Sequence, residues 1–225
     1  MMRLVSSGAR RLLKAGRLGV LASLAALALG GCAVLSAADS EPPSIFVLTA
    51  AKPAMPQEEP TRAQIVVAEP FSPAAYDTNR IVYLPTPNEV SYFADARWTD
   101  RAPRMVQALT VASLDNTGKF LAVGRKGAGL KPDYELRLEL RAFGVENESG
   151  AGKNVHIVLN ARLIDYPNDR IVASRSFEAV RPTNETRVAK LVLEFDTGLS
   201  GIMAEMAQWT HDAVEGHEEM KAREG

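Results

Sequence analysis

The clearest pattern along this chain is a strict alternation of apolar and charged residues from 134 to 141. Successive side chains of a strand point to opposite faces, so this pattern predicts a strand with one buried and one solvated face. Two apolar-rich stretches follow at 155–164 and 171–180, with a Pro-Asn-Asp turn signal between them at 167–169. The three segments therefore predict an antiparallel meander.

A helical period replaces this alternation at two places in the chain. Asp100 is the predicted N-cap of the first helix, Pro103 is tolerated in its first turn, and Asn116 and Gly118 are stop signals. The second helix is predicted from an apolar stripe spaced by four and three residues, which consists of Val188, Val192, Phe195, Leu199, Ile202, Met206, Trp209 and Ala213.

Two glycines, Gly198 and Gly201, interrupt the C-terminal helical pattern. Each lowers intrinsic helicity by about 1 kcal/mol relative to alanine. They either allow the helix to pack closely on a sheet or mark a kink near Asp196. The residues after Gly216 are strongly charged, so 217–225 is predicted to be a flexible tail.

Short apolar runs separated by proline-containing turns predict the remaining strands. These runs lie at 45–48, 65–68, 80–84, 90–93 and 120–123. Together with the two helices they predict a single α+β domain over 45–216. We expect a mixed or antiparallel sheet of about seven strands, covered on one face by the two helices.

The N-terminal 31 residues predict a secretory signal rather than part of the fold. Five basic residues and no acidic one precede an uncharged stretch, 18–31. A positive start followed by a short apolar core is typical of a signal peptide, and the stretch is shorter than the roughly 20 residues that span a membrane. No other stretch approaches that length, so no transmembrane helix is predicted in the mature protein.

The apolar stretch ends in Leu29, Gly30, Gly31 and Cys32, which resembles the lipobox cut by the lipoprotein signal peptidase. Cys32 is the single cysteine of the chain, and its thiolate is the nucleophile that would take the lipid. The alternative is a buried free cysteine in an ordinary domain. We predict a signal peptide at 1–31 and a lipidated N-terminus and tether at 32–44. Ala33, where aspartate would favour inner-membrane retention, favours the outer membrane, facing the periplasm.

Composition excludes several function classes for the mature chain. Cleavage before Cys32 removes five basic and no acidic residues, which shifts the net charge from −1 to −6. A nucleic-acid binder needs clustered basic charge, so none is predicted. The three histidines neighbour no serine motif, and with no second cysteine they predict neither a catalytic centre nor a zinc site. We therefore predict no enzyme activity, no cofactor and no metal.

Several stretches in order resemble the ABC-type transport auxiliary lipoproteins, a PqiC/YmbA-like family. The resemblance covers nearly all of the mature chain and is carried by 71–78, 80–83, 92–98, 100–103 and 133–136, and by Phe195 and Trp209. It implies a non-enzymatic outer-membrane lipoprotein of an MCE-type (mammalian cell entry type) transporter. The implied partner is an MCE-domain protein, the implied cargo is phospholipid or another hydrophobic molecule, and a homo-oligomer is left open.

Three aromatic residues before the first helix are the candidate partner contacts. Tyr92, Phe93 and Trp98 either contact the MCE-domain protein, since Tyr and Trp dominate interface hot spots, or anchor the first helix to the sheet. Two other functions are weighed against docking: a free-standing periplasmic lipid carrier and an outer-membrane assembly chaperone.

Overall fold

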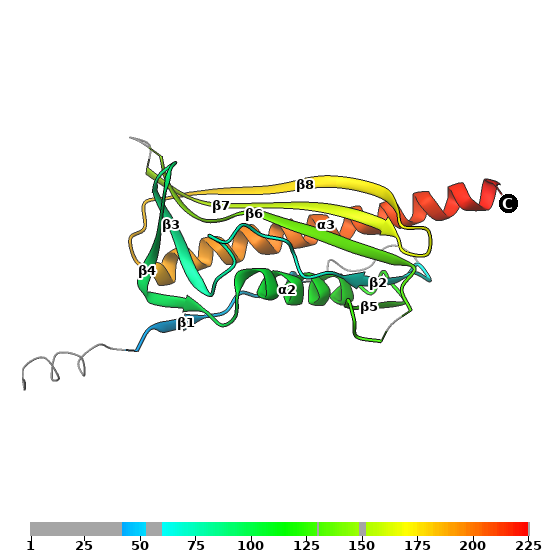
Figure 1. Ribbon diagram of the computed structural model, residues 1–225, viewed down its shortest axis with the longest axis horizontal. Coiled ribbons are helices and arrows are strands. Elements are labelled where there is room, and N and C mark those ends of the chain that lie inside the picture. Colours follow the sequence, from blue (N-terminus) through cyan, green and yellow to red (C-terminus); the bar gives the residue numbers. More distant parts are fainter. Residues whose placement is uncertain (1–41, 53–59, 130, 149–151, 225) are drawn as a thin grey trace, which may run out of the picture. The chain divides into compact units, whose positions relative to one another are not determined.

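The structure, a computed structural model of the chain, describes residues 42–52, 60–129, 131–148 and 152–224. The chain divides into two units, Met1–Pro42 and Pro43–Gly225, and every described element belongs to the second (Figure 1). The strands are β1 (Ser44–Phe46), β2 (Gln64–Val67), β3 (Arg80–Thr86), β4 (Glu89–Trp98), β5 (Ala122–Arg125), β6 (Tyr134–Glu148), β7 (Gly152–Asp165) and β8 (Arg170–Thr183). The helices are α2 (Ala102–Asn116) and α3 (Val188–Glu224).

Strands β6, β7 and β8 form the predicted antiparallel meander and are the longest strands of the sheet. The alternation that predicted β6 places its core face correctly: the tyrosine and the three leucines at even positions from 134 to 140 are buried, and of the charged residues between them only Glu135 is also buried. At Arg141 the register of β6 against β7 shifts, so that the buried positions continue at Phe143 and Val145. This irregularity keeps one face of a strand of 15 residues on the core.

The N-terminal strands make the sheet mixed. Both β2 and β3 pair with β6 in parallel, β2 beside the first residues of β6 and β3 beside its second half. Further out, β5 pairs with β2 in parallel, β4 pairs with β3 antiparallel, and β1 pairs with β4 in parallel. After β2, residues 68–71 run beside the middle of β6, where Phe71 forms a single bridge to Glu139.

The N-cap of helix α2 lies one residue after the predicted one. Arg101 occupies the N-cap position and makes no side-chain capping bond, whereas the carboxylate of Asp100 accepts a hydrogen bond from the Arg101 N–H at 2.7 Å. The prediction of Asp100 as the cap was therefore wrong. The predicted end is confirmed, because the helix stops at Asn116 and Gly118 follows with a positive φ of 63°.

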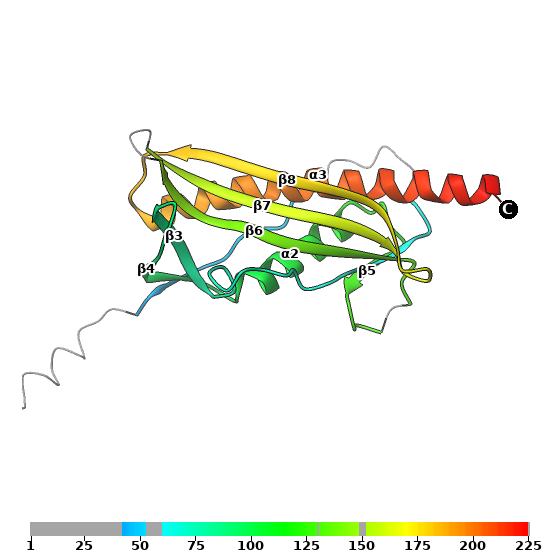
Figure 2. The same cartoon turned by 45° about the horizontal axis from the view of Figure 1, so that its top comes forward.

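Helix α3 lies along the same side of the sheet as α2 (Figures 1 and 2). Of the predicted apolar stripe, Val192, Phe195, Leu199, Ile202 and Met206 are buried, and Val188, Trp209 and Ala213 are half-buried against the core. A Cβ atom built on Gly198 would lie 3.3 Å from the Cβ of Ala179 and 3.4 Å from the Cδ1 of Ile157, whereas one on Gly201 would meet nothing within 4 Å. Gly198 is therefore required for close packing on β7 and β8, which decides between the two predicted roles at this position.

The last turns of α3 differ from the prediction of a flexible tail. The helix continues to Glu224, well beyond Gly216. Two side-chain contacts fasten this end to the sheet: the Tyr134 hydroxyl lies 3.0 Å from Nδ1 of His217, and Lys221 Nζ lies 3.0 Å from the buried carboxylate of Asp165. His217 and Lys221, which lie in the segment predicted to be flexible, thus contact polar partners on β6 and β7.

Trp98 lies in the centre of the core, where it joins three elements. Its ring centroid lies 5.6 Å from that of Phe143 on β6 and 5.2 Å from that of Phe195 on α3, and the latter two rings are 5.1 Å apart. All three side chains are nearly inaccessible to solvent. This aromatic triad fixes the end of β4 against the sheet and α3.

Candidate functional site

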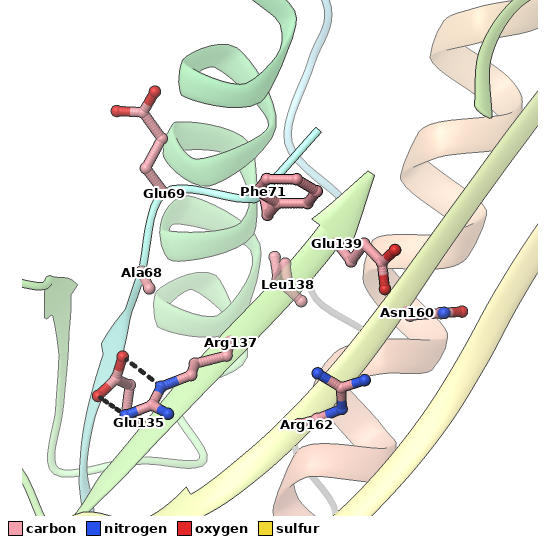
Figure 3. A pocket seen from close by; sticks show the side chains of 9 residues that line it. All are labelled: Ala68, Glu69, Phe71, Glu135, Arg137, Leu138, Glu139, Asn160 and Arg162. Carbon is pink, nitrogen blue, oxygen red and sulfur yellow. Dashed lines mark hydrogen bonds and ion pairs between the residues drawn. The ribbon is translucent and has the colours of Figure 1, made fainter. Parts of the chain in front are cut away.

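A pocket of about 360 Å³ opens over the middle of β6 (Figure 3). Its residues come from three neighbouring stretches of chain: the segment after β2 forms one wall, β6 forms the floor, and β7 forms the opposite wall. We call this site the β6 pocket, and its lining residues are Ala68, Glu69, Phe71, Glu135, Arg137, Leu138, Glu139, Asn160 and Arg162.

The strand register explains why residues so distant in sequence meet here. Phe71 is bridged to Glu139, which in turn pairs with Asn160, so these three residues form one row across the sheet. In the next row Arg137 of β6 lies directly opposite Arg162 of β7. Because side chains alternate between faces, the charged positions of β6 point away from the side that packs on the helices.

Each carboxylate of the β6 pocket has a basic partner. Glu135, almost wholly buried, accepts hydrogen bonds from Lys126 Nζ at 2.9 Å and from Arg137 Nε at 3.0 Å. Burial opposes ionisation of this carboxyl, but the bonds from Arg137 and Lys126 outweigh it and lower its pKa. The other two carboxylates are also paired, Glu69 with Arg101 and Glu139 with Arg141, each at 3.3 Å.

Two polar groups of the β6 pocket are left without such partners. Among the described residues, Arg162 makes no ion pair and no side-chain hydrogen bond. The side-chain oxygen Oδ1 of Asn160 is inaccessible to solvent and also lacks a hydrogen-bond partner within the described part of the chain. The pocket therefore offers one unneutralised cation and one unused buried acceptor, beside the exposed ring of Phe71.

The three aromatic residues predicted as partner contacts differ in how far they are buried. Trp98 is 2% exposed and belongs to the core triad, which supports its structural role. Tyr92 and Phe93 are half-buried on β4: Arg80 lies over the Tyr92 ring at 4.1 Å, and the Phe93 ring packs on Tyr83. For Tyr92 and Phe93 contact with a partner stays a prediction.

His156 lies between two carboxylates on the face of the sheet that carries the β6 pocket. Its Nδ1 is 2.9 Å from Glu146 of β6, and its Nε2 is 2.8 Å from Glu178 of β8. Burial lowers the pKa of the imidazole, but the two carboxylates outweigh it, so that the pKa is raised. The histidine thus links β6, β7 and β8. In the described ranges no cluster of side chains that could hold a metal ion is present.

The predicted lipidation site, Cys32, lies outside the described residues, as do the lipobox residues Leu29, Gly30 and Gly31. Within the part of the chain that the structure covers, no helix has the length and apolar character needed to cross a bilayer. The described residue nearest in sequence to Cys32 is Pro42, which precedes β1 by two positions.

Comparison with known proteins gives a consistent match over most of the chain. The family model for the ABC-type transport auxiliary lipoprotein component matches residues 46–207. The uncharacterized protein bll6063 of Bradyrhizobium diazoefficiens is 30% identical over 159 residues, which make up 71% of this chain and 42% of that protein. The chain thus spans less than half of that relative's length.

Solved structures with the same fold are also found. The crystal structure of protein XCC0632 from Xanthomonas campestris is 27% identical and has a TM-score of 0.71, over 78% of this chain and 99% of that one. A second, described as an uncharacterized protein, is 15% identical with a TM-score of 0.59, over 76% of this chain and 99% of that one. The latter shows a shared fold alone.

Proposed function

This chain belongs to the ABC-type transport auxiliary lipoprotein component family, and on that premise we propose that it is the non-enzymatic auxiliary subunit of an MCE-type transport system. In this role it docks the periplasmic assembly at the outer membrane. The system would move phospholipid or other hydrophobic molecules between the two membranes. The family match over 46–207 is the observation that carries the proposal.

The anchor in this proposal is a lipid on Cys32. A single acyl chain gives only marginal membrane binding, at about 0.8 kcal/mol per buried CH₂, so stable attachment needs two or more chains. The mature protein would begin at Cys32, and residues up to 44 would serve as the tether. The first described strand, β1, begins at Ser44, the last residue of this predicted tether.

The structure supports docking better than catalysis. The charged groups of the β6 pocket are mostly neutralised by direct ion pairs, and the described residues bring no nucleophile and general base together there. An exposed aromatic ring beside an unpaired guanidinium is instead the type of arrangement found in protein-binding surfaces.

Photo-crosslinking in intact cells tests this function. A photoreactive amino acid is placed at Phe71 or at Tyr92, and the captured protein is identified by mass spectrometry. We expect an MCE-domain protein in the crosslinked product from at least one position, and no such product from the control position Leu193, which is exposed on α3. Capture of an outer-membrane β-barrel protein alone would contradict the proposal and favour an assembly chaperone.

A further inference from the structure

We propose that the β6 pocket binds an extended peptide segment of a protein partner, one that presents an apolar side chain next to a carboxylate. The inference rests on the proposed function only for the identity of the protein that carries the segment. Its chemistry is derived from three features of the pocket: an unneutralised cation, an unused acceptor and an exposed aromatic ring on a hydrogen-bonded stretch of backbone.

The cation is Arg162, which lies directly opposite Arg137 across β6 and β7. Like charges in directly opposed strand positions destabilise a sheet unless a counter-charge is near. Arg137 has its counter-charge in Glu135, whereas Arg162 has none among the residues described. A carboxylate arriving from outside would form charge-assisted hydrogen bonds with the guanidinium and neutralise it.

The acceptor is Oδ1 of Asn160, in the row next to Arg162. This oxygen is inaccessible to solvent and unpaired within the described residues, and a buried acceptor without a partner is costly. Because this oxygen is inaccessible to solvent, a ligand donor would reach it only once the Asn160 amide rotates toward the pocket, and that bond would then satisfy the acceptor. An extended peptide supplies a backbone N–H group at every residue except proline, within reach of its own side-chain carboxylates.

The aromatic ring is that of Phe71, which is 72% exposed although its backbone is fixed. The Phe71 N–H donates to the Leu138 carbonyl at 3.0 Å, and the Phe71 carbonyl accepts from the Leu140 N–H at 2.8 Å. The backbone therefore holds the Cβ atom of Phe71 in a defined position, so burying the ring orders only the side-chain torsions. With Leu138 and Ala68 it forms the apolar side of the pocket.

The size of the pocket favours a peptide over a membrane lipid. A volume of about 360 Å³ lies near the lower end of the roughly 300 to 1,000 Å³ typical of small-molecule sites. Such a volume takes one or two side chains with their backbone. The same volume is too small to enclose the two acyl chains of a phospholipid, and each would be left largely in water.

A fluorescence anisotropy titration tests the proposal with the full-length lipoprotein in phosphatidylcholine nanodiscs. The probes are amidated hexapeptides with a fluorescent label at the N-terminus that place one aspartate between leucines, together with a matched, equally labelled set carrying asparagine instead. We expect saturable binding of the aspartate peptide, and binding of the asparagine peptide that is about tenfold weaker, the change given by the loss of one charge-assisted contact.

Four variants assign the binding to this pocket. Arg162→Gln should bring the two peptides to equal affinity, and Phe71→Ala should weaken both by about tenfold. The matched controls are Arg170→Gln, also an exposed arginine that has no ion pair within the described ranges, and Leu121→Ala, an exposed apolar residue. Both controls should bind as the unaltered protein does. The substituted residues are exposed, so all four variants keep the core intact.

Three results would overturn the inference. The first is the absence of saturable binding by any aspartate peptide. The second is an Arg162→Gln variant that still prefers the aspartate peptide over the asparagine peptide by the same factor as the unaltered protein. The third is binding of dihexanoylphosphatidylglycerol, below its micellar concentration, that depends on Arg162 while the peptides fail to bind. Because the assay contains no transporter component, a negative outcome rejects the pocket assignment and leaves the crosslinking test of the proposed function independent.

Discussion

Replacement of Trp98 by alanine tests whether this residue serves the core or a partner. The side chain is 2% exposed and touches aromatic rings of β6 and α3, at centroid distances of 5.6 and 5.2 Å. Truncation to alanine removes both ring contacts and leaves a cavity where β4 meets α3. The structure therefore predicts a large loss of stability.

The magnitude follows from buried aromatic truncations in other cores. Large-to-small changes of this kind cost about 3 to 5 kcal/mol, of which each aromatic pair accounts for about 0.5 to 1.5 kcal/mol. For a domain of this size each kcal/mol lowers the melting temperature by about 2 to 4 °C, so we expect a decrease of about 6 to 20 °C. Trp98→Phe, which keeps an aromatic ring at this position of the triad, should cost roughly 1 to 2 kcal/mol.

Urea denaturation followed by far-UV circular dichroism measures these differences, provided that the denaturant slope is unchanged. Tyr92→Ala is the control. Tyr92 is half-buried and holds Arg80 over its ring at 4.1 Å, so its loss should cost no more than about 1 kcal/mol. A Trp98→Ala protein that loses less than about 1 kcal/mol yet no longer captures a partner would refute the structural role.

Three further substitutions test the ion pairs on the face of the sheet that carries the β6 pocket and the packing of α3 on the opposite face. Because the pKa of His156 is raised in the fold, its contribution is fully present below the unfolded pKa of about 6.5 and is lost as pH rises through the folded pKa. The stability difference between the protein and His156→Gln should therefore shrink from pH 6 to pH 9; a difference that grows with pH would contradict this. Gly201→Ala should raise the free energy of unfolding by up to about 1 kcal/mol, since its Cβ meets nothing within 4 Å. Gly198→Val should lower it by about 1 to 3 kcal/mol, and equal effects at the two glycines would contradict the close packing of α3 on the sheet.

The meander and both helices could be predicted because their signals are local. Alternation over 134–141 placed β6 and its buried face correctly, and the apolar stripe placed α3. The order of the sheet could not be predicted in this way. The parallel pairing of β2 and β3 with different halves of β6 depends on contacts between segments that are distant in sequence, and no local pattern reports them.

The β6 pocket was missed for the same reason. Its alternating charges were visible in the sequence, but Phe71 entered only as part of the family resemblance and as an aromatic residue between prolines, and neither signal places it beside β6. Only the bridge from Phe71 to Glu139, and the pairing of β6 with β7, bring it beside Asn160 and Arg162. The length of α3 was likewise hidden, since the partner of Lys221 is the buried Asp165 on β7.

Fractionation of the envelope tests the proposed lipid anchor at Cys32. Inner and outer membranes are separated by density, and the N-terminal peptide of the protein is identified by mass spectrometry, for the unaltered chain and for Cys32→Ser. We predict a mature protein in the outer-membrane fraction that begins with a lipid-modified Cys32, and an uncut, unlipidated Cys32→Ser chain. Recovery of the unaltered chain in the soluble cytosolic fraction, with Met1 or Met2 still at its N-terminus, would contradict the account.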